Sequence, residues 1–428
     1  MERIKQLSAR KRRIVWMILA AVIAAGCALR FVHFNDVATR TPDERVYSKF
    51  AEHLATFGPR VLPGMYAQYE SNPIDWNYPP PTRIGHLVFV AAAMKISGVK
   101  DERTAAAVSL AFSCMSLLLL AWIGVRFFNP WVAIAAVAFL ATSVGELGMA
   151  RRAWQDSAFG FFGLLLVYLA CEITRNPRRL WLYPTFLACG VLNLLTKQTG
   201  VISYGACALW LLAFLIFRVK SWRGAVLLAL GGIASIGVTV GLWGISAGNT
   251  RVALSAFNHS LHPTDIGLGY LATCCSGPWY QFFDLLWIVG PLSAVLALFG
   301  AAVSLFPARW LQRIGRKTLI AEPACAPVAA CMTVAFFAFS SVYPGMQCLR
   351  YISPADGSFA LLAGFGLWYL LEWARGAMSR TDHRLLVVLA VLGVVLSGVR
   401  DYRTFTSVVV GSEMEDLSVS DIRFVLNR

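Results

Sequence analysis

The chain has 428 residues, of which 57% are hydrophobic and only 14% are charged, against about 25% charged residues in an ordinary soluble domain. A water-soluble fold of this size could not bury so much apolar surface, and an outer-membrane β-barrel needs alternating segments of about 10 residues, so both classes are excluded. The formal net charge of +15 comes from Lys and Arg residues in short loops between apolar runs, which is typical of membrane proteins and gives no reason to expect a nucleic acid partner.

The long apolar runs predict an all-α polytopic membrane protein, because about 20 apolar residues cross a bilayer as a helix. The first run follows a basic N-terminus and continues to Phe34, so we expect a retained span rather than a cleaved signal peptide. About 11 spans are expected in chain order, at residues 14–32, 104–125, 131–147, 157–173, 181–196, 201–217, 225–246, 283–306, 326–342, 352–371 and 385–399.

A further apolar segment, residues 84–96, is short and carries His86 and Lys95. If this segment does not cross the membrane, all the short basic loops fall on one side, which the positive-inside rule makes cytoplasmic. We therefore expect a cytoplasmic N-terminus, an interfacial or re-entrant helix over 84–96 on the outer face, and a short extracytoplasmic tail over 400–428. The basic loops are residues 3–13, 175–179, 218–223, 309–317 and 375–384.

The first outer loop, residues 34–103, contains a predicted amphipathic interfacial helix that begins at Pro42. Asp43 and Glu44 fall in its first turn, where an acid pair either stabilises the helix start or supplies a catalytic carboxylate. Tyr78 precedes three consecutive prolines, which either break a helix or hold a substrate contact in a rigid extended segment.

With this topology, the polar clusters outside the basic loops all lie on the extracytoplasmic side. Ionisable groups near membrane depth are costly, so their convergence on one face predicts a site there. These clusters are Asp43 with Glu44, Arg83, Arg103, residues 151–156, Lys197, residues 259–265, and Arg350 with Tyr351.

Short motifs follow one another along the chain in a definite order. They are RTPDER at 40–45, NYPPP at 77–81, Arg103 at the start of the second span, RRAWQD at 151–156, LLTK at 194–197, GPWY at 277–280 and RYISP at 350–354. This order and spacing resemble the GT-C membrane glycosyltransferases, in particular the superfamily of the protein O-mannosyltransferases, the lipid A aminoarabinose transferase and the rhizobial galacturonosyl and mannosyl transferases. The resemblance implies a GT-C transmembrane catalytic module over 1–355, the last transmembrane helices over 356–399, and a short tail where some relatives carry a large soluble domain.

The resemblance also implies transfer of a sugar from a polyprenyl phosphate to an extracytoplasmic lipid, glycan or protein, with inversion at the anomeric carbon. Asp43 matches the family's first acid and would be the general base, and Glu44 would either orient Asp43 or contact the acceptor. Asp156 matches a second carboxylate, which would position the acceptor or share the proton, unless it only caps a helix. Lys197 and Arg350 would bind the lipid phosphate, unless they only snorkel to the interface. Further phosphate candidates are Tyr351, Arg103 and Arg152.

Two histidines in the loop before the eighth span are candidates for substrate contacts. His259 and His262 stand three residues apart with Asp265 nearby, which is a loose pattern for a divalent cation. We expect no metal site and no required cofactor here, and interpret both as solvated residues near the acceptor. Tyr78 is a further substrate-binding candidate, although several relatives carry Lys or His just before the paired prolines.

Three other functions are compatible with the residues. A ligase or polymerase that uses a lipid diphosphate-linked oligosaccharide would typically have a longer late outer loop, and a transporter would show repeated halves with charges near the midplane. A carbohydrate-binding scaffold without catalysis would not need the acids. The basic loops and the apolar N-terminus predict a bacterial inner membrane with the site on its extracytoplasmic face, although an ER membrane has the same arrangement.

Overall fold

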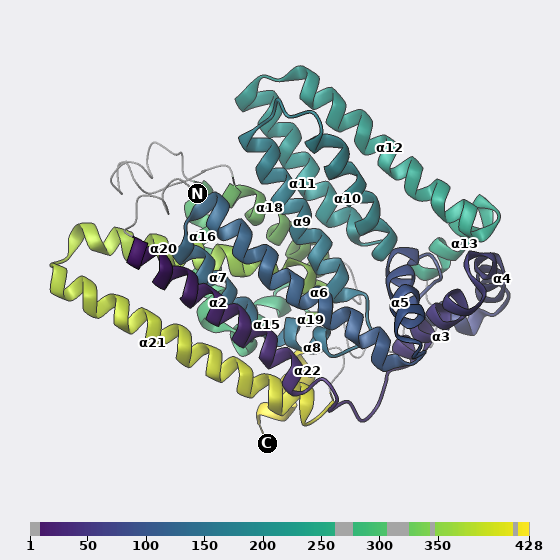
Figure 1. Cartoon of the computed structure of the whole chain (residues 1–428), viewed down its shortest axis with the longest axis horizontal. Helices are drawn as coiled ribbons and strands as arrows, with labels where there is room; N and C mark the ends of the chain where they lie inside the picture. Colours follow the sequence, from purple (N-terminus) through teal and green to yellow (C-terminus); the bar gives the residue numbers. More distant parts are fainter. Residues whose placement is uncertain (1–8, 262–276, 306–324, 343–346, 414–417, 428) are drawn as a thin grey trace.

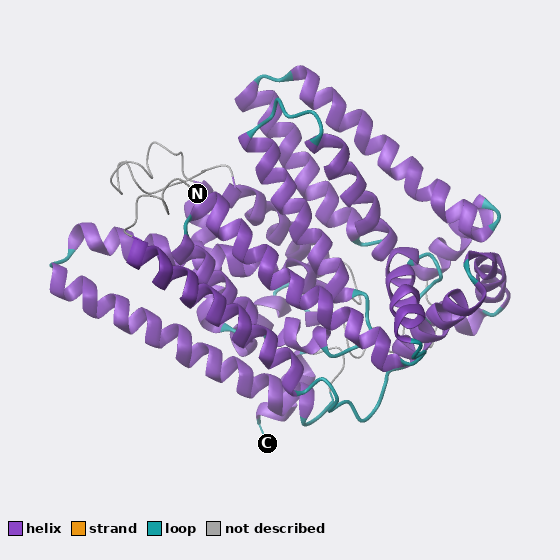
Figure 2. Ribbon diagram, in the orientation of Figure 1, coloured by secondary structure: helices purple, strands orange, loops and turns teal. Residues whose placement is uncertain are grey.

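The computed structural model describes residues 9–261, 277–305, 325–342, 347–413 and 418–427. Throughout these ranges the regular structure is helical and no strand is found (Figure 2). Within the same ranges, seven helices are long and apolar enough to cross a membrane, and one bent pair makes an eighth. The protein is therefore an all-α integral membrane protein, as the composition predicts.

Helical structure coincides with every one of the predicted spans. The helices concerned are α2 (Ala9–Val32), α6 (Glu102–Ile123), α7 (Pro130–Thr142), α8 (Val144–Ala150), α9 (Asp156–Arg175), α10 (Leu182–Thr196), α11 (Gly200–Phe214), α12 (Trp222–Ala247), α15 (Gln281–Val289), α16 (Pro291–Leu305), α18 (Cys325–Val342), α20 (Asp356–Ala377) and α21 (Arg380–Thr404). Three of them continue into a short π-helix, namely η3 (Gly124–Phe128), η4 (Leu215–Val219) and η6 (Phe405–Val410).

The remaining helices are shorter and belong to the connecting segments. They are α3 (Pro42–Phe57), η1 (Pro59–Val61), α4 (Leu62–Ser71), η2 (Pro73–Asn77), α5 (Ile84–Ser97), α13 (Thr250–Leu261), α19 (Leu349–Ile352), η5 (Ser353–Ala355) and α22 (Val419–Leu426). The helix expected over 84–96 is confirmed as α5, which packs against α3, α6 and α10. Its position relative to the membrane stays a prediction.

Two predicted spans are broken rather than continuous. The span over 131–147 bends by 61° at Ser143, between α7 and α8. At the bend, the guanidinium of Arg30 in α2 donates to the carbonyl oxygens of Leu140 and Ala141, at 3.2 and 3.4 Å. The span over 283–306 is divided at Gly290, where Pro291 starts α16. Hydropathy alone does not reveal such breaks, because the residues on both sides are equally apolar.

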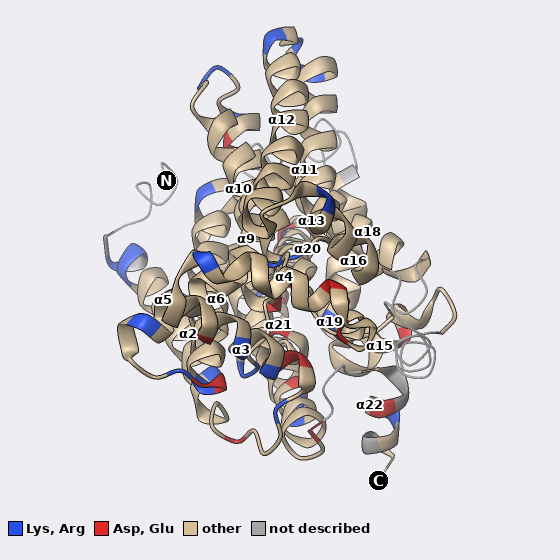
Figure 3. Cartoon of the chain, turned by 90° about the vertical axis from the view of Figure 1, so that its right-hand side faces the viewer, with Lys and Arg blue, Asp and Glu red and all other residues tan. Residues whose placement is uncertain are grey.

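The bundle is organised around α9 and α20. Helix α9 packs against α6, α10 and α11, and α20 packs against α7, α16 and α18. Helices α3, α4, α5 and α13 gather at one end of the molecule, away from the turns that join α11 to α12 and α20 to α21 (Figure 1). Basic residues lie at the end of α12 that is far from α13 in Figure 3. Residues 34–103 thus form a helical cap at the end of the bundle opposite those turns.

Close packing between α16 and α20 depends on glycine. A Cβ on Gly366 would collide with the carbonyl oxygen of Leu296, so only glycine lets the two backbones approach this closely. We predict that Gly366→Ala lowers the free energy of unfolding by about 1–3 kcal/mol, measured by thermal or denaturant unfolding in detergent. Gly376→Ala on the same helix meets nothing within 4 Å and should be neutral or slightly stabilising. Equal stability of the two variants would contradict this explanation.

Candidate functional site

The start of α3 fixes the direction of two adjacent carboxylates. Thr41 accepts a hydrogen bond from the backbone N–H of Glu44 at 3.1 Å, and the Glu44 carboxylate accepts one from the backbone N–H of Thr41 at 2.9 Å. This reciprocal pair is a capping box, and Pro42 occupies the first helical position. Consequently Glu44 points into the protein, with its side chain fully buried, while the side chain of Asp43 keeps 28% of its surface exposed.

Four residues that the sequence proposes for the site meet in one ion cluster. The guanidinium of Arg350 in α19 contacts Asp43 Oδ2 through Nη2 at 3.2 Å and Asp156 Oδ2 through Nε at 3.3 Å. Lys197, which directly follows α10, donates from Nζ to Asp156 Oδ1 at 2.6 Å. Asp156, the first residue of α9, is therefore engaged at both oxygens by the two predicted phosphate-binding cations.

Aromatic rings form the walls of this cluster. The Arg350 guanidinium lies 4.0 Å from the ring centre of Trp154, and Lys197 Nζ lies 5.0 Å from the ring of Tyr351 and 5.7 Å from that of Phe159. Cations placed over ring faces are stabilised by the ring quadrupole, and more so away from water. Tyr351 thus lies beside Lys197, as its candidate role in phosphate binding requires.

The cluster carries more positive than negative charge. Arg83, the residue before α5, donates to the Tyr47 hydroxyl and, at 3.3 Å, to Gln198 Oε1; no carboxylate pairs with it in the part of the chain that the structure describes. Three cations, Arg83, Lys197 and Arg350, thus stand against the two carboxylates Asp43 and Asp156. A buried excess of positive charge is costly, so an anion bound here would be stabilised.

Protonation equilibria reflect the same environment. Burial lowers the pKa of the Lys197 ammonium, and the charge of Asp156 opposes that effect. Burial alone would also lower the pKa of Arg350, but the carboxylates of Asp156 and Asp43 raise it well above its usual value. The guanidinium is therefore the permanent charge of the cluster, whereas the ammonium depends on the carboxylate beside it.

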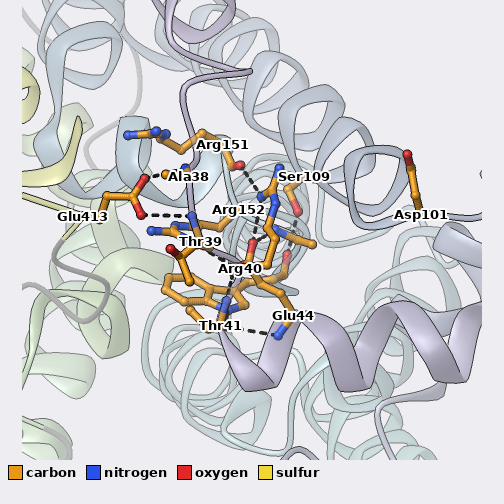
Figure 4. A network of polar contacts seen from close by, with 12 residues as sticks. Ala38, Thr39, Arg40, Thr41, Glu44, Asp101, Ser109, Arg151, Arg152 and Glu413 are labelled. Atoms are coloured by element: carbon orange, nitrogen blue, oxygen red, sulfur yellow. Dashed lines mark hydrogen bonds and ion pairs between the residues drawn. The ribbon is translucent and has the colours of Figure 1, made fainter. Parts of the chain in front are cut away.

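Glu44 belongs to a second network of polar contacts, which is drawn in Figure 4. Its carboxylate pairs with Arg40 Nη1 at 2.9 Å and Arg152 Nη1 at 3.1 Å, and accepts from the backbone N–H of Ala153 at 2.7 Å. Arg152 also donates to the carbonyl of Thr39 at 2.8 Å. The network fastens the start of α3 to residues 151–154, and so holds Asp43 next to Asp156.

Loss of the Glu44 charge should destabilise the protein. We predict that Glu44→Gln lowers the free energy of unfolding by about 3 kcal/mol, because it leaves the buried Arg152 and the half-buried Arg40 without their carboxylate. Unfolding followed by circular dichroism in detergent checks this. The matched control is Glu52→Gln at an exposed position of α3, with an expected change within about 0.5 kcal/mol. A similar stability for both variants would show that the network contributes little.

The remaining candidates lie apart from the ion cluster. Arg103 is exposed and has no polar partner among the residues described. His259 contacts Glu70 Oε1 through Nδ1 at 3.2 Å and stacks on Trp76 with ring centres 3.7 Å apart. His262 lies outside the described residues. Tyr78 lines a small cavity between α3, α4 and η2. In the described ranges, no group of three or more His, Cys, Asp or Glu residues is arranged to hold a metal ion.

Several residues of the site were not among the candidates. Arg83 has the same sequence signal as Lys197, because it too is a cation at the border of an apolar run, but the resemblance assigns no role to it. Tyr47 lies one turn after Asp43 on α3 and is completely buried. His86 is also completely buried, has no hydrogen-bond partner in the described structure, and burial lowers its pKa to about 3. The edge-to-face contact between His86 and Tyr47, at 5.3 Å, has no signature in sequence.

An apolar groove of 440 Å³ lies between α15, α16, α18 and α20. Its walls include Phe283, Leu286, Phe337 and Phe359. The polar groups along it are the hydroxyls of Thr333 and Ser341 and the indole N–H of Trp279. Helix α18, which forms one wall, also packs against α19, the helix that carries Arg350. The groove and the ion cluster are therefore both next to α18.

Solved structures show which known fold this arrangement has. ArnT from Cupriavidus metallidurans in the apo state is 17% identical and aligns with a TM-score of 0.52 over 90% of this chain and 64% of its own. ArnT bound to undecaprenyl phosphate is 16% identical, with a TM-score of 0.54 over 93% and 77%. The archaeal oligosaccharyltransferase AglB from Archaeoglobus fulgidus, in complex with an inhibitory peptide and a dolichol-phosphate, is 12% identical, with a TM-score of 0.54 over 96% and 57%.

ArnT and AglB are both GT-C enzymes, so the resemblance in the motifs is confirmed at the level of the fold. The sequence itself matches no family model and no curated protein. This chain spans 64% of the length of the apo ArnT chain and 57% of the AglB chain. The likeness thus assigns the GT-C fold to this chain, and the activity has to be argued from its own site.

Proposed function

We propose that the protein transfers a glycosyl group from a polyprenyl-phosphate-linked sugar to a lipid, glycan or protein acceptor. The observation that carries this proposal is the buried ion cluster, in which Arg83, Lys197 and Arg350 outnumber the carboxylates Asp43 and Asp156. A polyprenyl phosphate leaving group develops negative charge as the bond to the sugar breaks, and fixed cations in a water-poor site stabilise such charge. The complexes of ArnT with undecaprenyl phosphate and of AglB with a dolichol-phosphate support this donor class.

The lipid phosphate is assigned to Lys197 and Arg350, with Tyr351 and Arg83 beside them. Arg350 offers a planar fork suited to phosphate oxygens, and Lys197 supplies a compact charge. Asp156 holds both cations through its two oxygens, so we propose that it positions them. This places the second carboxylate of the site in a supporting role rather than in contact with the acceptor.

Asp43 is proposed as the general base that takes the proton of the acceptor. It is the only acid of the described ion cluster with an exposed face, since 28% of its side chain is accessible whereas Asp156 is enclosed. Its contact with Arg350, at 3.2 Å, joins the base to the phosphate-binding cation. Glu44 keeps this geometry by anchoring the first turn of α3, and is therefore proposed as a positioning residue.

The lipid tail is assigned to the apolar groove between α15, α16, α18 and α20. An isoprenoid chain needs an apolar path that begins at the phosphate site, and the helix that carries Arg350 packs against one wall of this groove. Burial of apolar surface stabilises such a chain by about 25 cal/mol per Å². Because the cations supply the electrostatic stabilisation, the proposed reaction requires no cofactor.

The positive-inside rule supports an extracytoplasmic position for this site. The helices α3, α4, α5 and α13 lie at the opposite end of the bundle from the basic loops 218–223 and 375–384 (Figure 1). We therefore propose a bacterial inner membrane protein whose donor and acceptor meet on the outer face. Cysteine-scanning of Arg60 in the cap and Arg380 at the start of α21, with a membrane-impermeant thiol reagent in whole cells, tests this orientation.

The decisive experiment follows the lipid product. Purified protein is incubated with a panel of short-chain polyprenyl-phosphate sugars and a cell-envelope extract, and released polyprenyl phosphate is measured by mass spectrometry. Release with one sugar, dependent on the extract, supports the proposal. Release of a polyprenyl diphosphate from lipid diphosphate-linked oligosaccharides would identify the ligase or polymerase instead. No release from either donor class would reject glycosyl transfer and favour transport.

A further inference from the structure

A small cavity lies next to the proposed base and has no role in the reaction described so far. Its volume is 110 Å³, several times the space that one water needs. The walls come from α3, α4 and the segment after η2, and consist of Val46, Lys49, Phe50, His53, Gln68, Tyr69, Asp75, Tyr78 and Pro79. The lining thus combines aromatic rings with a carboxylate, an amide and two basic groups.

The cavity continues the face of α3 that carries Asp43. Val46, Phe50 and His53 follow Asp43 by three, seven and ten residues, which places all four on one side of the helix. At a rise of about 1.5 Å per residue, the near edge of the cavity begins about 5 Å along the axis from Asp43. A group seated in the cavity would therefore lie within reach of the proposed base.

One polar group in the wall lacks a partner. Tyr69 lines the cavity and is only 2% exposed, and its hydroxyl is buried and makes no hydrogen bond in the described structure. The indole N–H of Trp76 donates to the Tyr69 carbonyl at 3.0 Å and fixes this part of α4 against η2. An orphaned buried hydroxyl costs free energy until a ligand pairs with it. A ligand that reaches this hydroxyl from the cavity would therefore supply the missing partner.

The chemistry of the lining favours a sugar ring. Lys49 and Asp75 carry opposite charges, so the cavity is not selective for a strongly charged ligand. The rings of Phe50, Tyr69 and Tyr78 offer flat apolar surfaces, on which the C–H face of a pyranose packs. The carboxylate, the amide and the Tyr69 hydroxyl supply both acceptors and donors for its hydroxyl groups.

We propose that this cavity seats one sugar ring of a saccharide acceptor and presents an acceptor hydroxyl to Asp43. The acceptor role rests on the proposed function, whereas sugar binding itself does not. Among the lipid, glycan and protein acceptors, this proposal favours glycans and glycolipids over a protein without attached sugars. Burial raises the pKa of Tyr69 and the charge of Arg83 opposes this effect, which agrees with a cavity that borders the ion cluster.

Direct binding of simple sugars tests the inference. Protein in phosphatidylcholine nanodiscs is titrated with methyl glycosides of glucose, galactose, mannose and N-acetylglucosamine, and binding is measured by saturation-transfer NMR. Maltoside detergents are avoided because their head groups are sugars. We expect at least one glycoside to bind, and Tyr69→Phe to weaken it by about tenfold, since that change removes a single hydrogen bond.

The structure offers a matched control on the same helix. Tyr66 is completely buried, its hydroxyl also lacks a partner in the described structure, and it does not line the cavity. Tyr66→Phe should bind the glycoside like the native protein. Asp75→Asn, an isosteric change in the cavity wall, should weaken binding as Tyr69→Phe does, and serves if the latter folds poorly.

Separate outcomes distinguish this inference from the proposed function. If the native protein binds undecaprenyl phosphate but no glycoside, the cavity proposal is overturned and the proposed donor class stands. If glycosides bind but the lipid phosphate does not, the proposed function fails and the sugar site remains. Equal losses in Tyr69→Phe and Tyr66→Phe, or displacement of the bound glycoside by a Ser/Thr-containing hexapeptide, would also overturn the saccharide assignment.

Discussion

Replacing Asp43 with Asn should reduce the release of polyprenyl phosphate by about 10²- to 10⁴-fold, the usual contribution of a general base. The amide of Asn keeps the shape of the side chain but cannot act as a base and take the proton from the acceptor substrate. Binding of the donor should be nearly unchanged, since Lys197, Arg350 and Asp156 remain in place. The measurement is the initial rate of product release by mass spectrometry, with donor affinity determined separately by calorimetry.

The stability of the Asp43→Asn variant separates catalysis from folding. Asp43 is part-exposed and makes one ion pair, so its loss should change the free energy of unfolding by less than about 1 kcal/mol. Glu52→Gln, at an exposed position of the same helix, is the activity control and should retain native turnover. Near-native turnover of Asp43→Asn would exclude Asp43 as the base, whatever its effect on stability.

The sequence predicts the helices of this protein well, because apolar runs of membrane length leave few alternatives. It also identifies Asp43, Asp156, Lys197 and Arg350, which the structure brings together although they come from separate parts of the chain. The reason is that ionisable residues at the ends of apolar runs are costly, and such residues converge where they compensate one another. When the charged residues outside the basic loops lie on one side of the membrane, their distribution therefore indicates the site without any knowledge of the packing.

Other features depend on contacts that no sequence pattern encodes. Glu44 has the spacing of a capping box, but its pairing with Arg40 and Arg152 depends on how residues 151–154 pack against α3. The break at Ser143 is stabilised by Arg30 from another helix, so it cannot be predicted from the local sequence. From the sequence alone, Trp154 cannot be distinguished from an ordinary core residue. Only the structure shows that the Arg350 guanidinium lies over its ring.

The expected consequence of removing Arg350 follows from its two contacts. Arg350 joins the proposed base to the carboxylate that holds Lys197, so its loss removes one proposed phosphate contact and also releases Asp43. We predict that Arg350→Met lowers the rate of transfer by about 10²- to 10³-fold, the effect of deleting one donor to a developing negative charge. Donor affinity should also fall, because a charge-assisted hydrogen bond contributes about 1.5–3 kcal/mol.

Arg350→Lys distinguishes charge from geometry. A lysine keeps the positive charge but has no planar fork, so it cannot contact Asp43 and Asp156 together as the guanidinium does. We therefore expect donor affinity between those of the native protein and Arg350→Met, with a rate of transfer close to that of Arg350→Met. Calorimetry with undecaprenyl phosphate in nanodiscs gives the affinity, and Lys95→Met, at an exposed position in the last turn of α5, controls for loss of one positive charge. If Arg350→Met and Lys197→Met both bind undecaprenyl phosphate with native affinity, the phosphate does not bind at this cluster, and Arg350 and Lys197 serve only to neutralise Asp156.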